Sequence, residues 1–484
     1  MPIEPKNEHI SRRPRRGASI RNNKKKGQYL VKIIIIGAGE VGFHIAGRLA
    51  LENKDVVLID SNLDSIRRVT DHIDVQTIHG SGSSPAVLDE AGIRGAEILL
   101  AVTDRDETNL VACLAAHIIS PNTKKLARLR DAAYDPYHQI FRDNPPFIDT
   151  IINPEIEVVN TINRLLSVPG AVDVTDFEGG RIKFIGVTLA ATSRMAGASL
   201  SDLPGLFGDS RPLIAAIVRN EELIVPSGTD RLMPDDLVYF ICKQDILSET
   251  LEMFHKSHEP LRRVLIVGGG RIGYRLAAML EKKSIHTKII ERNAERCSTL
   301  AKSLNKTVVL CGDGSDQELL REENIRDMDA LVAVTDNEET NILVSLLGKR
   351  MGARNSITKI SRFSYFPLLS TIGVDQVVST RLSAISSILQ HIRRGKILSA
   401  MTLKGEQAEV LEAVALETSD IVGKPVRKIA FPKGALLVSV VRRDDIIIPT
   451  GDTVVEPGDK IIIFAKRQVV PKIEKFLTVK LEFF

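Results

Sequence analysis

A glycine-rich segment after the first apolar run has the spacing that brings a backbone turn against a phosphate group. Gly37, Gly39 and Gly42 follow Ile33–Ile36 in the pattern Gly-x-Gly-x-x-Gly. The first glycine permits a tight turn, the second lets the backbone approach a phosphate, and the third lets a helix pack closely on the strand. The free N–H groups at the start of that helix then favour the phosphate charge. The predicted contacts of this turn also include the residues between the glycines, Glu40 and Val41.

An acidic residue at the end of the next apolar run extends this pattern. Asp60 lies 23 residues after Gly37, where a carboxylate accepts hydrogen bonds from the hydroxyls of a ribose. A carboxylate disfavours a 2′-phosphate and therefore NADP. It does not separate NAD from ATP, because both ligands present a ribose diol. The pattern predicts a nucleotide ligand, with NAD(H) and ATP or ADP as open alternatives.

The same pattern returns in the second half of the chain. KIIIIGAGEVGFHIAGRL at 32–49 matches RVLIVGGGRIGYRLAAML at 263–280, an offset of 231. A single glycine pattern is weak evidence, but two copies at a fixed offset, each with a spaced acid, are strong evidence for two nucleotide lobes. The predicted contacts in the second copy are Gly268, Gly270, Arg271, Ile272, Gly273 and Glu291.

Two further pairs of repeated segments follow apolar runs and are expected at the ligand-binding edge of a parallel sheet. AVTDRDETN at 101–109 returns as AVTDNEETN at 333–341, and a Gly-x-Gly-Ser turn occurs at 80–83 and 312–315. Helix capping, including a cap by Asp104, is an equally good explanation of the first segment, and turn geometry alone explains the glycines of the second. The residues predicted to line the two pockets are Gly80, Thr103, Asp104 and Asn109, with Gly312, Asp313, Thr335, Asp336 and Asn341.

These motifs need a parallel sheet to position them. Short apolar runs near 32–36, 55–59, 74–78, 97–102 and 125–129 alternate with helical patterns, which is typical of a doubly wound α/β sheet of the Rossmann type. A third repeat, of 225–241 at 448–464, falls in regions rich in Pro/Gly turns and indicates two small α+β C-lobes. The expected order is a basic tail at 1–29, a first nucleotide lobe at 30–150, a linker helix at 151–175, a first C-lobe at 176–258, a second nucleotide lobe at 259–375, a second linker helix at 376–405 and a second C-lobe at 406–484.

Each linker carries an apolar stripe at near-helical spacing. Such a stripe packs in a core or forms a contact between copies of the chain, and the sequence leaves both alternatives open. The stripes comprise Ile156, Val159, Ile162, Leu165 and Leu166, and Val378, Leu382, Ile385, Ile388, Leu389 and Ile392.

The charge is concentrated in one segment. Residues 1–29 have a formal charge of +7, which leaves −3 for the rest of the chain, so we expect no basic face for nucleic acid. Aromatic residues make up only 4% of the chain, which also disfavours base stacking. We expect the basic segment to be disordered. Two alternatives remain for its function: it binds anionic lipid through its positive charge, or it has no specific role.

The remaining composition indicates a cytoplasmic protein. No stretch of about 18 apolar residues occurs, so no transmembrane helix is expected. The four cysteines, Cys113, Cys242, Cys297 and Cys311, have no metal-binding spacing and suit a reducing compartment. An NAD-dependent oxidoreductase is a weaker alternative, because the second C-lobe contains no histidine that could relay a proton. We therefore predict no catalytic and no metal-binding residues.

The glycine turns, the two acids, the AVTDxxETN segments and the paired C-lobes together resemble the TrkA family over about residues 30–484. That family joins two RCK (KTN) nucleotide lobes, each followed by a TrkA-C lobe. The resemblance implies NAD(H) and ATP or ADP as ligands, and homotetrameric rings at the cytoplasmic face of the inner membrane. It further implies a peripheral regulatory subunit that gates a membrane-embedded Trk-type potassium transporter (TrkH/TrkG-like). A subunit of a cation/proton antiporter or of another RCK-gated channel is the alternative.

One departure from the family pattern bears on the ligands. The Gly-Asp-Gly turn of the family is present as Gly312, Asp313 and Gly314, but the first copy has Ser81 between its glycines. The resemblance therefore leaves open whether both lobes prefer the same ligand.

Overall fold

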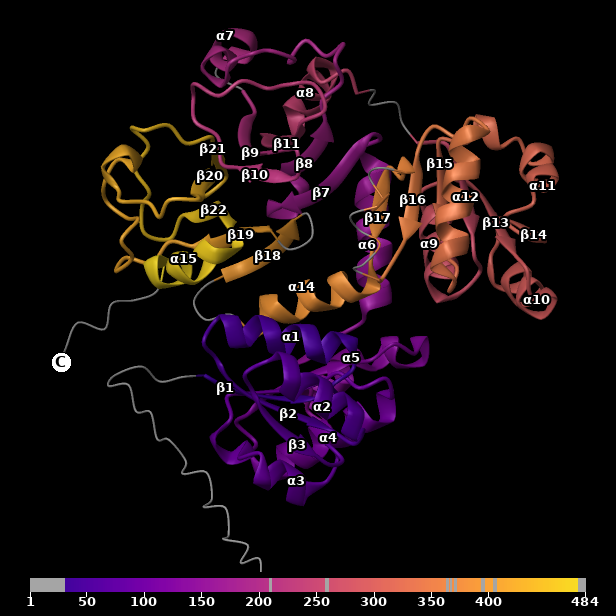
Figure 1. The fold of residues 1–484 in the computed structure, drawn as a ribbon, viewed down its shortest axis with the longest axis vertical. Coiled ribbons are helices and arrows are strands. Elements are labelled where there is room, and N and C mark those ends of the chain that lie inside the picture. The colour runs from indigo at the N-terminus through magenta and orange to yellow at the C-terminus, as the bar shows by residue number, and fades with distance from the viewer. Residues whose placement is uncertain are drawn as a thin grey trace, which may run out of the picture.

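The computed structural model describes residues 31–477, apart from 209–210, 257–260, 363–364, 366–367, 370–371, 393–396 and 404–406. The basic tail expected at 1–29 lies outside the described residues. The described part folds into four lobes, built on two parallel and two antiparallel sheets (Figure 1). The duplicated doubly wound fold predicted from the repeat is confirmed.

The first nucleotide lobe is a six-stranded parallel sheet of order β3-β2-β1-β4-β5-β6. Ile33–Ile36 are at most 1% exposed, because helices cover both faces of the sheet. The strand order reverses between β1 and β4, which places a ligand-binding crevice at the end of β1. The main elements are β1 (Lys32–Ile36), α1 (Glu40–Leu51), β2 (Asp55–Asp60), α2 (Leu63–His72), β3 (Gln76–His79), α3 (Pro85–Glu90), β4 (Ile98–Ala101), α4 (Asp106–Ile119), β5 (Lys124–Arg128), α5 (His138–Asp143) and β6 (Thr150–Ile152).

The second nucleotide lobe repeats this arrangement. Its sheet has the order β14-β13-β12-β15-β16-β17, with all strands parallel. Both sheets therefore have their switch point beside a glycine turn. The main elements are β12 (Arg263–Val267), α9 (Arg271–Lys282), β13 (His286–Glu291), α10 (Ala294–Ser303), β14 (Val308–Cys311), α11 (Gln317–Glu322), β15 (Ala330–Ala333), α12 (Glu338–Arg350), β16 (Ser356–Lys359) and β17 (Gln376–Val378).

Each C-lobe is a five-stranded antiparallel sheet, of order β10-β9-β11-β8-β7 in the first and β18-β19-β22-β20-β21 in the second. The two sheets share one apolar cluster that includes Phe184, Tyr239, Val410 and Phe464, so the C-lobes pack on one another. Their elements are β7 (Ala171–Phe177), β8 (Ile182–Thr188), α7 (Leu203–Phe207), β9 (Leu213–Arg219), β10 (Glu222–Ile224), β11 (Leu237–Lys243) and α8 (Leu247–Met253), and β18 (Ile397–Leu403), β19 (Ala408–Val414), β20 (Ala435–Arg442), β21 (Asp445–Ile447), β22 (Lys460–Lys466) and α15 (Val470–Leu477).

The two linker helices, α6 (Pro154–Ser167) and α14 (Thr380–Ile392), cross between the halves of the chain. Helix α14 lies on α1 of the first nucleotide lobe, and α6 lies against α9 of the second (Figure 1). Ile385, Ile388 and Leu389 of α14 join the core of the first lobe. Val159 and Ile162 of α6 share a cluster with α9. Of the two alternatives that the sequence left open, the structure shows core packing, but on the lobe of the opposite half.

Polar contacts add to this crossed packing. The Arg48 guanidinium of α1 forms an ion pair with Glu409 of β19, and both side chains are buried, at 4% and 1% exposed. Lys283 after α9 donates a hydrogen bond of 2.5 Å to Asn163 of α6. The Gln376 amide of β17 donates to the Ala171 carbonyl of β7. The four lobes are therefore joined at several places by pairs of residues that lie far apart in the sequence.

Four of the expected boundaries shift in the structure. β6 ends at Ile152 and β17 ends at Val378, so both parallel sheets extend past residues 150 and 375. β7 and β18 begin at Ala171 and Ile397, inside the segments expected as linkers at 151–175 and 376–405. The reason is that β6 and β17 are edge strands of only three residues, two of them apolar, which a sequence pattern does not separate from the helical stripe that follows.

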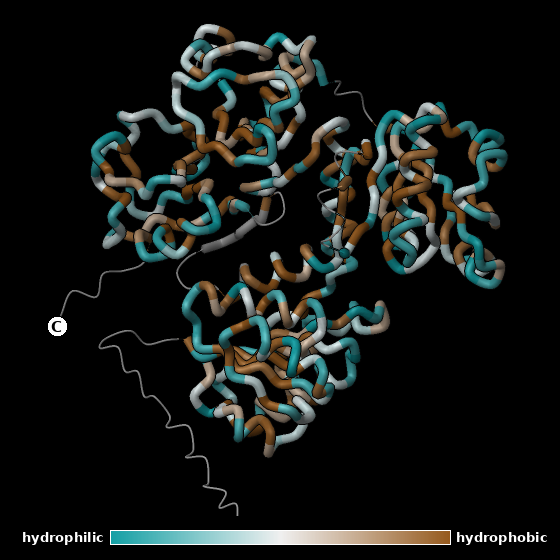
Figure 2. Tube along the Cα trace, in the orientation of Figure 1, coloured by the Kyte–Doolittle hydropathy of each residue, from teal (hydrophilic) through white to brown (hydrophobic). Residues whose placement is uncertain are grey.

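Apolar residues gather on the strands inside each lobe, whereas polar residues dominate the outer loops and helix faces (Figure 2). In the described residues, no helix is both long enough and apolar enough to span a bilayer.

Candidate nucleotide-binding sites

The first glycine turn joins β1 to α1 and lines a cavity of about 520 Å³. Gly37 has a φ of +107°, a conformation that favours glycine. A Cβ atom on Gly42 would lie 1.8 Å from the Gly37 carbonyl oxygen, so this position admits only glycine without a shift of the turn. A Cβ atom on Gly39 would meet nothing within 4 Å, because Gly39 faces the open cavity. Gly37, Gly39, Glu40 and Val41 line the cavity, and Gly42 lies behind the turn.

Asp60 ends β2 beside this turn and lines the same cavity. Its Oδ2 accepts a hydrogen bond of 2.5 Å from the Ala38 backbone N–H, and its Oδ1 accepts one of 2.7 Å from the Asn62 N–H. An ionised carboxylate has about four lone-pair positions. Asp60 therefore holds the turn in place and retains acceptor capacity towards the cavity.

The segment after β4 contributes to the cavity through Thr103 and Asp104. Asn109 does not reach the cavity, because it is fully buried. Its Oδ1 accepts hydrogen bonds from the Thr103 N–H at 3.0 Å and the Thr103 hydroxyl at 2.7 Å, so it positions the loop from behind. Asp104 does not cap α4, since the residue at the N-cap is Arg105.

The turn after β3 places Ser81 and Gly82, rather than Gly80, at the cavity. A Cβ atom on Gly80 would lie 2.9 Å from Val87 Cγ2, so the close packing of α3 explains this glycine.

The second cavity, of about 860 Å³, lies at the start of α9 and differs from the first in its lining. Of the residues predicted from the sequence, Gly270, Arg271, Ile272 and Asp336 line it. Gly269 joins them although the sequence did not indicate it. The predicted residues that do not line it are Gly268, Gly273, Glu291, Gly312, Asp313, Thr335 and Asn341.

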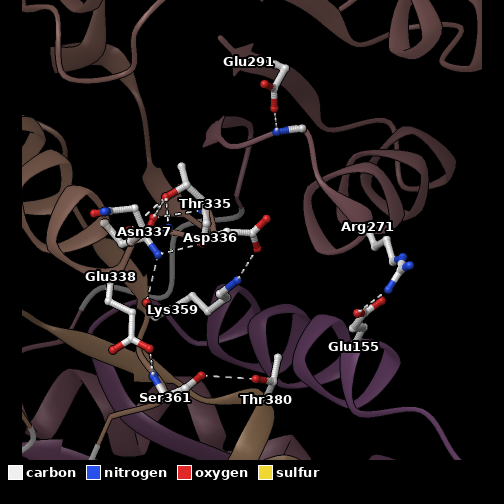
Figure 3. A network of polar contacts seen from close by, with 12 residues as sticks. Glu155, Arg271, Glu291, Thr335, Asp336, Asn337, Glu338, Lys359, Ser361 and Thr380 are labelled. Atoms are coloured by element: carbon white, nitrogen blue, oxygen red, sulfur yellow. Dashed lines mark hydrogen bonds and ion pairs between the residues drawn. The ribbon is translucent and has the colours of Figure 1, made fainter. Parts of the chain in front are cut away.

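Glu291 is more enclosed than its counterpart Asp60. It is 8% exposed, and its Oε2 accepts a 2.8 Å hydrogen bond from the Gly269 backbone N–H (Figure 3). Its Oε1 accepts another of 2.8 Å from the Asn293 backbone N–H. Arg296 approaches the same carboxylate at 3.6 Å. The two copies thus share a backbone design but present different surfaces to a ligand.

The side chains of Asn341 and Asp313 also form hydrogen bonds within the protein that stabilise its own loops. Asn341 is fully buried and accepts hydrogen bonds from the Thr335 N–H and hydroxyl, as Asn109 does in the first copy. The Asp313 carboxylate accepts hydrogen bonds from the Ser315 hydroxyl and N–H, which hold the pKa of Asp313 below its ordinary value.

Basic side chains between the two cavities were not anticipated from the sequence. Arg128, at the end of β5, lines both cavities, and Arg130 and Lys359 line the second. The Arg128 Nε atom is buried and has no hydrogen-bond partner among the described residues. Burial, followed by the charge of Arg130, lowers the pKa of Arg128. An incoming anion would relieve both costs.

Each cavity also contains residues from the opposite half of the chain. Ser361, Thr380 and Arg381 of the second half line the first cavity, and Pro154 and Glu155 of the first half line the second. Figure 3 shows this junction, where Arg271 faces Glu155, and Ser361 and Thr380 are joined by a hydrogen bond. The apolar stripes of the two linkers were visible in the sequence, but they do not reveal this crossing.

Comparison with known proteins agrees with this architecture. The TrkA-N domain family matches residues 33–154 and 264–380, and the TrkA-C domain family matches 184–255 and 410–478. A relative from Azorhizobium caulinodans is 38% identical over 94% of this chain and all of its own length, and one from Halomonas elongata is 37% identical with the same coverage. Both are named Trk system potassium uptake protein TrkA.

Solved structures share the fold. The GsuK RCK domain has a TM-score of 0.57 and 17% identity, covering 93% of this chain and 95% of that one. The GsuK channel bound to NAD has the same TM-score and identity, covering 93% of this chain and 79% of that one. The chain thus belongs to the TrkA family, a family of potassium uptake system proteins and not of oxidoreductases.

Proposed function

We propose that this chain is a peripheral regulatory subunit that senses nucleotides and gates a Trk-type potassium transporter at the cytoplasmic face of the membrane. The observation that carries this proposal is the composition of the two cavities, each of which is lined by both halves of the chain. A ligand in such a cavity contacts two bodies at once, and its binding free energy depends on their relative position. The names of full-length relatives support potassium uptake as the process.

The residues of the first cavity fit NAD(H), with ATP or ADP as further ligands. The α1 N-terminus and the open Gly39 position suit a pyrophosphate. The remaining lone pairs of Asp60 suit a ribose diol, and Arg128 supplies a partly buried cation for phosphate charge. A bound nucleotide supplies the charge and the contacts that the gating needs, and no chemical turnover is required.

The linker helices are the elements through which binding reaches the rest of the assembly. A ligand shifts a conformational equilibrium only through different affinities for the two states. In this chain a change in the angle between α14 and α1, or between α6 and α9, alters the cavity itself. Couplings of about 1–3 kcal/mol, or 5–150-fold in affinity, are typical and are sufficient to bias a gate.

We further propose that the chain assembles as a homotetrameric ring beneath its membrane partner, a potassium-transporting subunit of the TrkH/TrkG type. Light scattering of the purified full chain at micromolar concentration tests the assembly. A stable monomer would argue against a ring.

The direct test of function combines binding and transport. Isothermal calorimetry with NADH and ATP should give binding at the first cavity that Gly39→Asp abolishes, because the new carboxylate enters the phosphate position there. Asp60→Ala should weaken binding less, by about 1–3 kcal/mol, the value of a hydrogen bond to a charged group. The nucleotide dependence of potassium flux through the partner transporter in proteoliposomes should then change in Gly39→Asp, because only the second cavity still binds. Unchanged flux regulation in Gly39→Asp and in Gly270→Asp would contradict the proposal.

A further inference from the structure

The residue that follows the second glycine of each turn carries opposite charge in the two copies. It is Glu40 in the first lobe and Arg271 in the second, and each is the first residue of its helix. The linker helix that lies on each lobe carries the opposite charge at the facing position. Its second residue is Arg381 on α14, facing Glu40, and Glu155 on α6, facing Arg271. The two ion pairs occupy equivalent places and exchange the sign of their charges.

Both pairs lie at the rim of a nucleotide cavity. Arg381 and Glu40 are 3.0 Å apart and both line the first cavity. Arg271 and Glu155 are 3.4 Å apart and both line the second (Figure 3). The linker-helix member is the more buried one in each pair, with Arg381 17% and Glu155 14% exposed at the side chain. Each pair therefore joins a nucleotide lobe to the opposite half of the chain next to the place that a phosphate would take.

The two arginines belong to different bodies, and this difference decides what an anion does to each of the two ion pairs. A phosphate at the start of α1 attracts Arg381, which belongs to the linker helix, so the ligand adds a bridge between lobe and helix. A phosphate at the start of α9 attracts Arg271, which belongs to the lobe itself. It then competes with Glu155 for that arginine and repels the Glu155 carboxylate. Because Glu155 is mostly buried, water screens this repulsion only partly.

We propose that nucleotide phosphate has opposite mechanical effects at the two sites: it tightens the contact of α14 with the first lobe and loosens the contact of α6 with the second. This inference rests on the proposed nucleotide binding. Nucleotide binding at the two pockets then acts in opposite directions, and the ratio of their nucleotide occupancies sets the relative position of the two halves. A chain with two identical charge pairs would add the two signals instead.

The local surroundings support this assignment of roles. Glu40 is also held by Arg68 of its own lobe, at 2.6 Å. It therefore keeps a positive partner when a phosphate draws Arg381 away. Glu155 forms no second ion pair within the described residues, and its Oε2 atom is buried there without a hydrogen-bond partner. The Arg128 charge acts on Glu155 through the Coulomb interaction but forms no ion pair with it. When the phosphate draws Arg271 away, it repels the Glu155 carboxylate, and movement of α6 away from the lobe relieves this repulsion.

Hydrogen–deuterium exchange on the full chain tests the proposal, with NADH and ATP as separate probes. Gly270→Asp leaves only the first pocket competent and Gly39→Asp only the second. Neither Cβ position has an atom within 4 Å, so the added carboxylate has space. Calorimetry on the same samples establishes which probe binds which pocket. We expect bound ligand to slow exchange in residues 380–392 severalfold in the first variant and to speed exchange in residues 154–167 severalfold in the second.

A charge swap provides the matched control. Glu155→Arg combined with Arg271→Glu keeps an ion pair at the same place but moves the arginine onto α6. Ligand in the second pocket should then slow exchange in 154–167, the opposite of the response in the unswapped chain. Binding with the same direction of change at both helices, or a response that the swap leaves unaltered in sign, would overturn the inference while the proposed function stands. No binding of either nucleotide to any variant would overturn the proposed function and the inference together.

Discussion

Gly42 offers the sharpest test of how the first nucleotide lobe is built. A Cβ atom at this position would lie 1.8 Å from the Gly37 carbonyl oxygen and 3.0 Å from its carbonyl carbon. To reach 3.0 Å from the oxygen, the shortest separation that real Cβ atoms show, the turn and the helix must part by about 1.2 Å. The neighbour is backbone rather than the end of a flexible side chain, and the Gly37 N–H is held by a 2.8 Å hydrogen bond to the Ile59 carbonyl, so it cannot move aside easily.

The cost of Gly42→Ala follows from two opposing effects. Overpacking costs about 1–3 kcal/mol, and a clash with constrained backbone belongs at the upper end of this range. Alanine in a helix gains up to about 1 kcal/mol over glycine. We therefore expect the free energy of unfolding of the first lobe to fall by about 2 kcal/mol. We also expect nucleotide affinity to fall, because the turn that receives the phosphates has moved.

Gly39→Ala is the matched control, three residues away on the same turn. Its Cβ atom meets nothing within 4 Å, and its φ of −63° is open to any residue. The stability loss should stay below about 1 kcal/mol, the difference between glycine and alanine at an N-cap, while NADH affinity falls because the methyl group enters the cavity. Gly273→Ala and Gly270→Ala repeat the comparison in the second lobe, where the clash distance is 1.9 Å.

Urea denaturation followed by circular dichroism measures the stability of these variants, and calorimetry measures their NADH affinity. The reasoning fails if Gly42→Ala is as stable as the unmodified chain, or if Gly39→Ala destabilises the lobe as much as Gly42→Ala does.

Three further predictions concern charges and thiols. Arg48→Met leaves the buried Glu409 carboxylate without this partner and should cost about 3–5 kcal/mol of unfolding free energy; a loss below 1 kcal/mol in denaturation would contradict it. Burial alone would raise the pKa of Glu40, but its arginine neighbours, Arg381 among them, outweigh burial and lower it. The stability that Glu40 adds over Glu40→Gln is therefore complete at neutral pH and should be lost as the pH falls from the ordinary glutamate pKa, about 4.3, through the lower pKa of the folded state, as a pH series of denaturation curves would reveal. Burial raises the pKa of the Cys113, Cys242 and Cys297 thiols to about 11 or 12, whereas Cys311 is exposed. Iodoacetamide should therefore modify only Cys311, and mass spectrometry should find one adduct on the folded chain.

The architecture of the nucleotide lobes was predictable because its signals are local. A continuous apolar strand, a glycine turn and a spaced acid lie within 30 residues of one another, and the repeat doubled the evidence. The first cavity accordingly contains most of the residues predicted for it, including Gly39, Asp60 and Thr103.

The contributions from the other half were not predictable in the same way. Arg381 and Glu40 are separated by 341 positions, and nothing in the sequence indicates that α14 lies on α1 rather than on its own lobe. The predicted contact role of Asn109 and Asn341 is replaced by a positioning role, because a buried amide and an exposed one look alike in sequence. Glu291 ends its strand as Asp60 does, where the pattern predicted it, yet it is largely buried and does not line the second cavity.

The crossed linker helices also impose an order on the biosynthesis of the protein. Helix α6 leaves the ribosome with the part of its apolar stripe that faces α9 uncovered, because α9 begins at Arg271, more than 100 residues later. At about 5–20 residues per second, this surface waits roughly 5–20 seconds for its cover. The matching face of α1 waits longer still, until α14 has been made near the end of the chain. The nascent first half therefore exposes apolar surface and is prone to aggregation. We expect a chain truncated before residue 271 to be bound by chaperones or degraded by proteases rather than to persist as a free nucleotide-binding domain.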